Sequence, residues 1–294
     1  SPPCGQQGRR FEEEDLFPYT SDLLKGVAGL YYFSGTASGA FDASLGANVP
    51  PLTSLTQGSV DTESIAVYFD TTWALTDRLN MNVGARWNED DKEADVFVQL
   101  YAGRLAPNAT LFDPSNVPAG FVAVGAPQTN YTNSRSFSDV SPRLGFDFDF
   151  TDNVLGYVSY SQGFKSGGFD MRGNEAANPA TRNGYDSETA DNYEIGVKST
   201  LLDGRVQLNL TAFYTPYEDV QITTQEFQIV NGQPQNVTAV LNAGKQTNQG
   251  VELETLWRPV QALTLTLNVG WLDAEFDESI WRSEERRVGK ECRS

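Results

Sequence analysis

The chain has 294 residues with 39 acidic and 21 basic side chains, and its net charge of −18 argues against the basic surface that a nucleic-acid partner requires. It contains no histidine and only two cysteines, which excludes Ser-His-Asp and Cys-His catalysis and a disulfide framework. No apolar run reaches the roughly 18 residues of a transmembrane helix.

Residues 1–23 precede the first predicted strand, and we expect them to be irregular. Beyond them, apolar and polar residues alternate. The segment 79–87, for example, reads LNMNVGARW, in which every second residue from Leu79 to Trp87 is apolar. A period of two places the two sets on opposite faces of a strand. On this basis nine strands are predicted, at residues 24–34, 62–74, 79–100, 137–150, 153–164, 187–200, 205–227, 236–258 and 262–277.

The connections between the predicted strands are of two kinds. Short turns lie at 75–78, 151–152, 201–204 and 259–261. Longer polar connections lie at 35–61, 101–136, 166–186 and around 231–235. The two kinds alternate from residue 62 onward, which predicts an up-and-down meander with short turns at one end and long loops at the other.

Such a meander is compatible with a transmembrane barrel or with a soluble antiparallel sandwich. Strand length favours the barrel, because soluble strands usually have about 5–6 residues and membrane-crossing strands need roughly 9–11. Aromatic residues near strand ends, as in interfacial girdles, favour it as well: Trp73, Trp87, Tyr214, Trp257 and Trp271. The predicted fold class is therefore all-β, an antiparallel up-and-down transmembrane β-barrel whose charged face lines a hydrated lumen.

Most of residues 27–277 resembles the TonB-dependent outer-membrane receptors, including the upstream segments VAGLYYF at 27–33 and TESIAVYFDTTWALTDRLNMNVGARW at 62–87. The most specific is YSQGFKSGGFD at 160–170; others are SPRLGFDFDFTDNVLGYVSYS at 141–161, the hairpin at 185–222, and NAGKQTNQGVELE at 242–254. The resemblance implies a protein of the bacterial cell outer membrane that imports a scarce ligand, such as a ferric siderophore, cobalamin, haem or an oligosaccharide. It implies energy from TonB, no enzymatic activity, no cofactor, and contact with outer-membrane lipid and a small-molecule ligand such as a metal chelate.

Barrels of this kind close with about 22 strands around a plug, whereas about nine are predicted here. The resemblance therefore implies a partial barrel at 24–277, with the plug domain that contacts TonB absent. After residue 277 the alternation stops, and 282–294 reads RSEERRVGKECRS. We expect 278–294 to be a non-native tail.

Three long loops, at 101–136, 166–186 and 227–235, are expected to face the ligand. Their aromatic residues Phe112, Phe121 and Tyr131 are candidates for stacking on a sugar or catecholate, with packing of the loops against one another as the alternative. Lys165 is placed at the lumen mouth or the lipid headgroups. Glycines 167 and 168 are interpreted as loop-entry residues that permit a positive φ. No catalytic or metal-binding residue is predicted.

Two other functions remain open at this point. A passive porin-like channel has the same architecture without energy coupling. A secreted carbohydrate-binding β-sandwich has the same alternation with its apolar face inward, and it would stay soluble without detergent. A barrel enzyme is a third possibility, against which the absence of histidine argues.

Overall fold

The computed structural model describes residues 7–45, 52–103, 120–230 and 233–278. These residues form thirteen β-strands and one short 3-10 helix, η1 (Pro179–Asn183). The strands are β1 (Gln7–Thr20), β2 (Leu24–Leu45), β3 (Leu52–Ala74), β4 (Leu79–Ala102), β5 (Val122–Ala123), β6 (Thr129–Thr151), β7 (Val154–Lys165), β8 (Glu188–Leu201), β9 (Val206–Glu218), β10 (Gln221–Val230), β11 (Gln233–Asn242), β12 (Lys245–Val260) and β13 (Leu263–Glu278). No helix among the described residues has the length and apolar character needed to cross a membrane.

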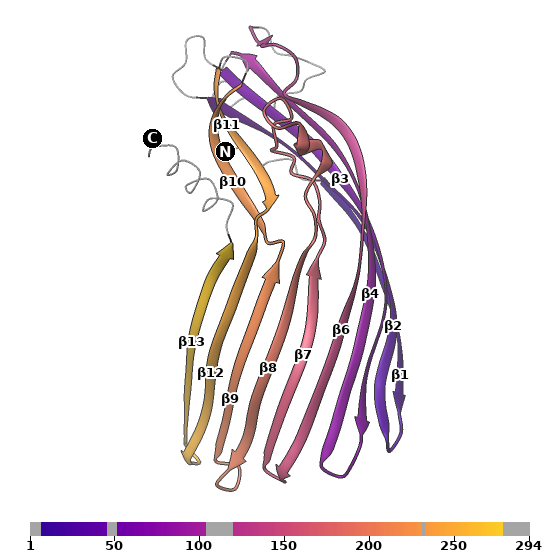
Figure 1. Cartoon of the computed structure of the whole chain (residues 1–294), viewed down its shortest axis with the longest axis vertical. Helices are drawn as coiled ribbons and strands as arrows, with labels where there is room; N and C mark the ends of the chain where they lie inside the picture. Colours follow the sequence, from indigo (N-terminus) through magenta and orange to yellow (C-terminus); the bar gives the residue numbers. More distant parts are fainter. Residues whose placement is uncertain (1–6, 46–51, 104–119, 231–232, 279–294) are drawn as a thin grey trace, which may run out of the picture.

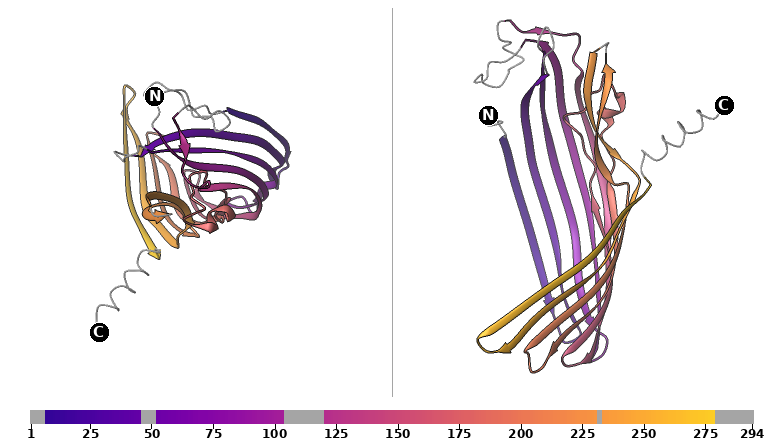
Figure 2. Two further views of the ribbon diagram at one scale, coloured as in Figure 1. Left: turned by 90° about the horizontal axis from the view of Figure 1, so that it is seen from above. Right: turned by 90° about the vertical axis from the view of Figure 1, so that its left-hand side faces the viewer.

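The main sheet has eleven strands in the order β1-β2-β3-β4-β6-β7-β8-β9-β12-β13, with β5 added at the upper end of β4. All neighbours are antiparallel, and the sheet curls into an open, curved wall (Figures 1 and 2). Tight turns join the strands at the lower end, and longer segments lie at the upper end. The predicted antiparallel up-and-down barrel class is therefore confirmed.

One face of the wall is apolar and exposed. Val158 on β7 lies between Phe146 on β6 and Ile195 on β8, and these side chains are 45%, 37% and 58% exposed. Tyr160, on the same face, contacts Tyr193 with a centroid distance of 5.1 Å, and Tyr193 contacts Tyr214 at 6.3 Å. An apolar band edged by aromatic rings is the surface that a barrel presents to lipid.

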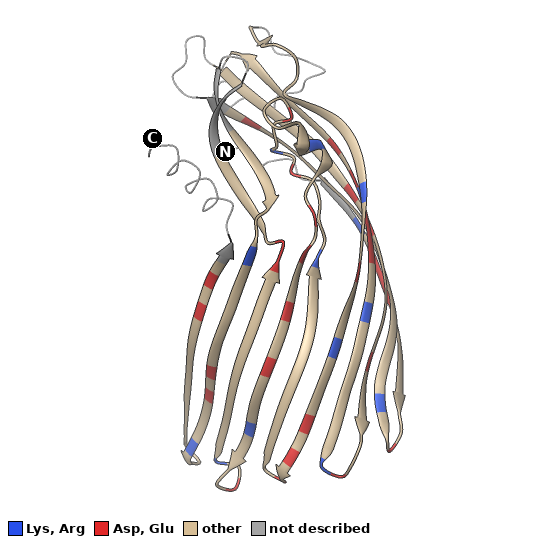
Figure 3. Cartoon of the chain, in the orientation of Figure 1, with Lys and Arg blue, Asp and Glu red and all other residues tan. Residues whose placement is uncertain are grey.

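The opposite face carries polar side chains that bond across strands, and charged residues recur along the length of the wall (Figure 3). Asn82 donates to Asp147 at 2.7 Å, and the Tyr157 hydroxyl donates to Glu194 at 2.5 Å. Such pairing between lumen-facing groups holds neighbouring strands in register while leaving the face hydrated. This polar face is the one that the sequence predicted to line the lumen.

The expectation that residues 1–23 are irregular was wrong, because β1 pairs with β2 along its whole length. Glu13 and Asp15 interrupt the apolar set on the outward face of β1, so the sequence shows no clean alternation. Backbone hydrogen bonds to β2 hold β1 as a strand, although its side chains do not alternate cleanly.

The predicted strand count was also wrong. The expected strands 205–227 and 236–258 are each broken, giving β9 and β10 on one side and β11 and β12 on the other. The breaks fall at Asp219, with φ of 54°, and at Gly244, with φ of 89°. A left-handed residue cannot continue an extended strand. The β10–β11 hairpin therefore forms its own two-stranded sheet.

Several strands are longer than predicted because pairing continues past the apolar band. The β2–β3 register is unbroken from Leu24 opposite Trp73 to Leu45 opposite Leu52. The expected long loop at 35–61 is therefore mostly a tall, polar hairpin. Residues 279–294 lie outside the described part of the chain, so the expected non-native tail stays a prediction.

Candidate ligand-facing site at the barrel mouth

The segment between β7 and β8, residues 166–187, folds back over the polar face of the wall; we call it the inner loop (Figure 1). Phe169 from this loop is 7% exposed and packs with side chains from β4 and β6. The buried cluster consists of Ala94, Val96, Val98, Tyr131 and Phe169, with Val60 and Met171 packed against it. The face that carries polar, lumen-lining residues lower in the wall thus carries a small apolar core at the mouth.

Glycines let the two ends of the inner loop approach each other closely. The backbone of Gly168 exchanges hydrogen bonds of 3.1 and 2.8 Å with that of Tyr185. A Cβ on Gly167 would overlap the Tyr185 carbonyl oxygen and the Phe137 ring. Neither Gly167 nor Gly168 has a positive φ, so the interpretation of this pair as positive-φ residues was wrong. The left-handed residue is Gly184, with φ of 69°.

Two basic residues of the wall hold the inner loop in place. Lys92 Nζ donates to Ser166 Oγ at 2.6 Å and to the Gly167 carbonyl at 2.7 Å. Burial lowers the pKa of Lys92, and nearby Asp90 opposes that effect. Arg135 forms an ion pair of 2.5 Å with Asp186. Both cations lie above the apolar band, where the loop covers them in part.

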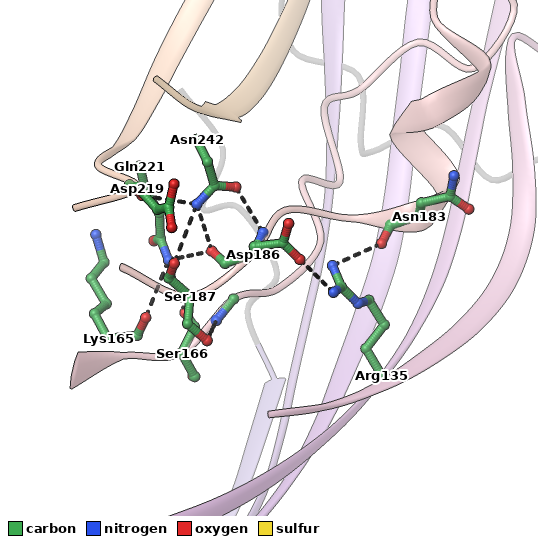
Figure 4. Close-up of polar contacts among 10 residues, drawn as sticks. Arg135, Lys165, Ser166, Asn183, Asp186, Ser187, Asp219, Gln221 and Asn242 are labelled. Carbon is green, nitrogen blue, oxygen red and sulfur yellow. Dashed lines mark hydrogen bonds and ion pairs between the residues drawn. The ribbon is translucent and has the colours of Figure 1, made fainter. Parts of the chain in front are cut away.

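The inner loop also contacts the β10–β11 hairpin (Figure 4). Asn242 Nδ2 donates to the Asp186 and Asp219 carbonyls, each at 2.9 Å. Gln221 Nε2 donates to the Ser166 carbonyl at 3.1 Å and to that of Asp186 at 3.0 Å. The inner loop is therefore fixed on one side to the wall and on the other to the hairpin.

The four candidate site residues have different surroundings. Phe112 lies outside the described residues. Phe121 packs against the buried pair Leu55 and Tyr101, at positions that share the apolar-face parity of β3 and β4. Tyr131 is 5% exposed beneath the inner loop, with its ring centroid 6.4 Å from that of Phe169. Phe121 thus packs against two strands and Tyr131 lies on a strand beneath the inner loop, and contact of either ring with a ligand stays a prediction.

Lys165 ends β7 at the start of the inner loop. Its side chain is 64% exposed, and its Nζ lies 3.9 Å from a Glu188 carboxylate oxygen. The structure thus brings Tyr131 and Lys165 to the inner loop and places Phe121 elsewhere. Sequence reasoning missed the roles of Lys92, Arg135 and Asn242. Lys92 and Arg135 show only as long basic side chains on strands beyond the apolar band, and Asn242 shows only as the first residue of the segment at 242–254.

The Tyr131 hydroxyl is buried and has no hydrogen-bond partner among the residues that the structure describes. Burial raises the pKa of Tyr131 to about 12, with Asp170 and Glu175 adding to the effect. Stability that depends on the neutral phenol is present below pH 10, the usual pKa of tyrosine, and is lost as pH rises towards 12. At pH 8 we expect the free energy of unfolding of the Tyr131→Phe variant to equal that of the wild type or to exceed it by up to about 1 kcal/mol.

The same variant should lose less stability than the wild type above pH 10, with a residual loss from Tyr185, whose pKa burial also raises. Thermal unfolding of refolded protein in detergent micelles, followed by circular dichroism from pH 8 to 12, measures both effects. A marked destabilisation by Tyr131→Phe at pH 8 would mean that the hydroxyl has a partner.

Below the inner loop, the polar face is hollowed by a cavity of about 580 Å³. Its lining includes both signs of charge, from Arg143, Asp147, Glu194 and Lys198. Arg143 also forms an ion pair of 2.9 Å with Asp70. No group of three or more His, Cys, Asp or Glu side chains in the described part of the chain is arranged to hold a metal ion. The charged lining of this cavity suits non-covalent contact with a polar molecule.

An open wall with a lipid-type apolar face, a polar lumen face and a loop assembly at its mouth defines part of a transmembrane β-barrel. The family described as TonB dependent receptor-like, beta-barrel, matches residues 6–291. The chain belongs to this family.

The pesticin receptor of Yersinia enterocolitica is 27% identical over 231 residues, which is 78% of this chain and 29% of that receptor. The metal-pseudopaline receptor CntO of Pseudomonas aeruginosa is 31% identical over 145 residues, covering 48% of this chain and 18% of CntO. The crystal structure of the ferric yersiniabactin uptake receptor FyuA from Yersinia pestis has the same fold, with a TM-score of 0.67 at 23% identity. That match covers 94% of this chain and 37% of FyuA. The chain thus spans about a third or less of these proteins.

Proposed function

We propose that this chain is barrel wall of an outer-membrane receptor that imports a metal chelate, with a ferric siderophore as the leading class. The printed names of its relatives support the ligand class, since they include a metal-pseudopaline receptor and the catecholate siderophore receptor Fiu of Escherichia coli. The proposal includes placement in the bacterial outer membrane, energy from TonB through a plug domain, and no covalent chemistry by this chain.

The observation that carries the proposal is the inner loop. It is fixed across the polar face at the end of the wall opposite the tight turns, which is the external end in a barrel of this topology. A ligand arriving from outside meets the inner loop and the hairpin before it meets the lumen. We propose that the ligand contacts loop surface at 166–187, with Lys165 at its margin, while Tyr131 supports the loop from beneath.

The test replaces residues 166–187 by a Gly-Ser linker in the full-length receptor that contains this chain. We expect binding of the cognate ferric siderophore, found by screening ferric catecholates and other ferric chelates for radioactive iron uptake, to weaken by about tenfold or more, since a preorganised surface is lost. The control replaces the tight turn at 202–204, at the opposite end. Unchanged affinity after replacement of the inner loop, the hairpin tip and the 104–128 connection together would refute the proposal.

Iron uptake by cells that produce the receptor distinguishes energised import from diffusion through a passive porin-like channel. Import through TonB stops when the proton gradient is collapsed or when TonB is deleted, whereas diffusion through a pore continues. Uptake that is unaffected by both treatments would favour the channel.

A further inference from the structure

Asp186 lies at the centre of the junction drawn in Figure 4. Its carboxylate accepts from Arg135 Nη2 at 2.5 Å, which links it to β6 in the wall. Its backbone N–H donates to Asn242 Oδ1 at 2.7 Å, and its carbonyl accepts from Asn242 Nδ2 at 2.9 Å. One residue of the inner loop is therefore bonded to the wall through its side chain and to the hairpin through its main chain.

The hairpin depends on such contacts for its position. It is outside the main sheet, and both of its connections pass through left-handed residues, Asp219 and Gly244. Asn242 also donates to the Asp219 carbonyl at 2.9 Å, so one amide contacts the inner loop and the root of the hairpin together. A backbone bridge between Gly173 and Thr238 also joins the inner loop to the hairpin.

Arg135 makes no contact with the hairpin of its own among the interactions described. It donates to the Asn183 carbonyl at 3.2 Å and lies 4.8 Å from the centroid of the Phe137 ring, besides its ion pair with Asp186. Any influence of Arg135 on the hairpin therefore has to pass through the inner loop.

We propose that Arg135, Asp186 and Asn242 form a relay that couples the barrel wall to the β10–β11 hairpin, so that the inner loop and the hairpin order together. The three are positioning residues. The inference deepens the proposed function, because it makes two ligand-facing segments one responsive unit. Displacing Asp186 breaks its ion pair with the wall and the bonds that Asn242 and Gln221 make to its carbonyl, while Gln221 keeps its bond to the Ser166 carbonyl.

The test is a double-mutant cycle of Arg135→Ala and Asn242→Ala in the full-length receptor in detergent micelles, without ligand. Amide hydrogen exchange is read separately for the inner loop and for β10 and β11. We expect Asn242→Ala to speed exchange of the hairpin amides on the order of tenfold, since several side-chain hydrogen bonds are lost. Arg135→Ala should speed exchange in both segments.

The decisive result is non-additivity. In the Asn242→Ala background, where Gln221 still bonds the hairpin to the inner loop, Arg135→Ala should still loosen the inner loop but add less in the hairpin than it does in the wild type. Additive effects on the hairpin, or an Arg135→Ala effect confined to the inner loop, would overturn the relay. Arg135→Lys, which keeps a charged donor for Asp186, should restore part of the hairpin protection.

A matched control is Asn130→Ala, the same chemical change at an exposed position on β6. It should leave exchange in both segments unchanged. Because no ligand is used, the relay can fail while metal-chelate import stands, and import can fail while the relay stands.

Discussion

Val158→Arg should prevent the wall from assembling in lipid. Val158 is 45% exposed in the middle of the apolar face, between Phe146 and Ile195. An arginine near the midplane of the lipid face of a barrel costs about 2–4 kcal/mol. The fraction of full-length receptor that folds into liposomes, measured by the heat-dependent shift in gel mobility, should fall accordingly.

The neighbouring residue supplies the control. Ser159 lies opposite Glu194 on the polar face, so Ser159→Arg places the same charge in a hydrated lumen. It should fold into liposomes far better than Val158→Arg. If the two variants fold equally well, or the order is reversed, then the assignment of the two faces is incorrect.

Gly167→Ala should detach the start of the inner loop. The added methyl group overlaps the Tyr185 carbonyl oxygen and the Phe137 ring, and the carbonyl belongs to backbone that cannot rotate away. Such overpacking costs about 1–3 kcal/mol. Limited proteolysis within 166–187 should become faster, while the strands of the main sheet stay protected.

Gly163→Ala is the matched comparison, four positions earlier on β7, where an added Cβ meets no atom within 4 Å. Its effect should stay within about 0.5 kcal/mol. Equal protease sensitivity of the two variants would show that the close approach at Gly167 does not hold the loop.

The apolar face could be predicted because apolar residues occupy every second position of the strands that form it. Val158, Phe146 and Ile195 each belong to an alternating run, and the register follows from the runs and the tight turns between them. β1 was missed because acidic residues interrupt its apolar set. The tall ends of β2 and β3 were missed because backbone pairing beyond the apolar band needs no particular side chain.

The site was harder to predict than the wall. Aromaticity suggested Tyr131 as a ligand contact, but alternation along β6 gives no information on which loop covers that face. Lys92 and Arg135 bond mainly to backbone carbonyls and to Asp186, contacts that depend on how residues far apart in the chain fold back. Neither the composition nor the spacing of residues predicts these contacts between segments far apart in the chain.

The separation of the β10–β11 hairpin from the main sheet has an evolutionary consequence. Because neither hairpin strand shares a hydrogen-bond ladder with β9 or β12, residues can be gained, lost or exchanged between Asp219 and Gly244 without shifting the barrel register. The outer part of the hairpin can thus change in length while Gln221 and Asn242 at its base keep their bonds to the inner loop.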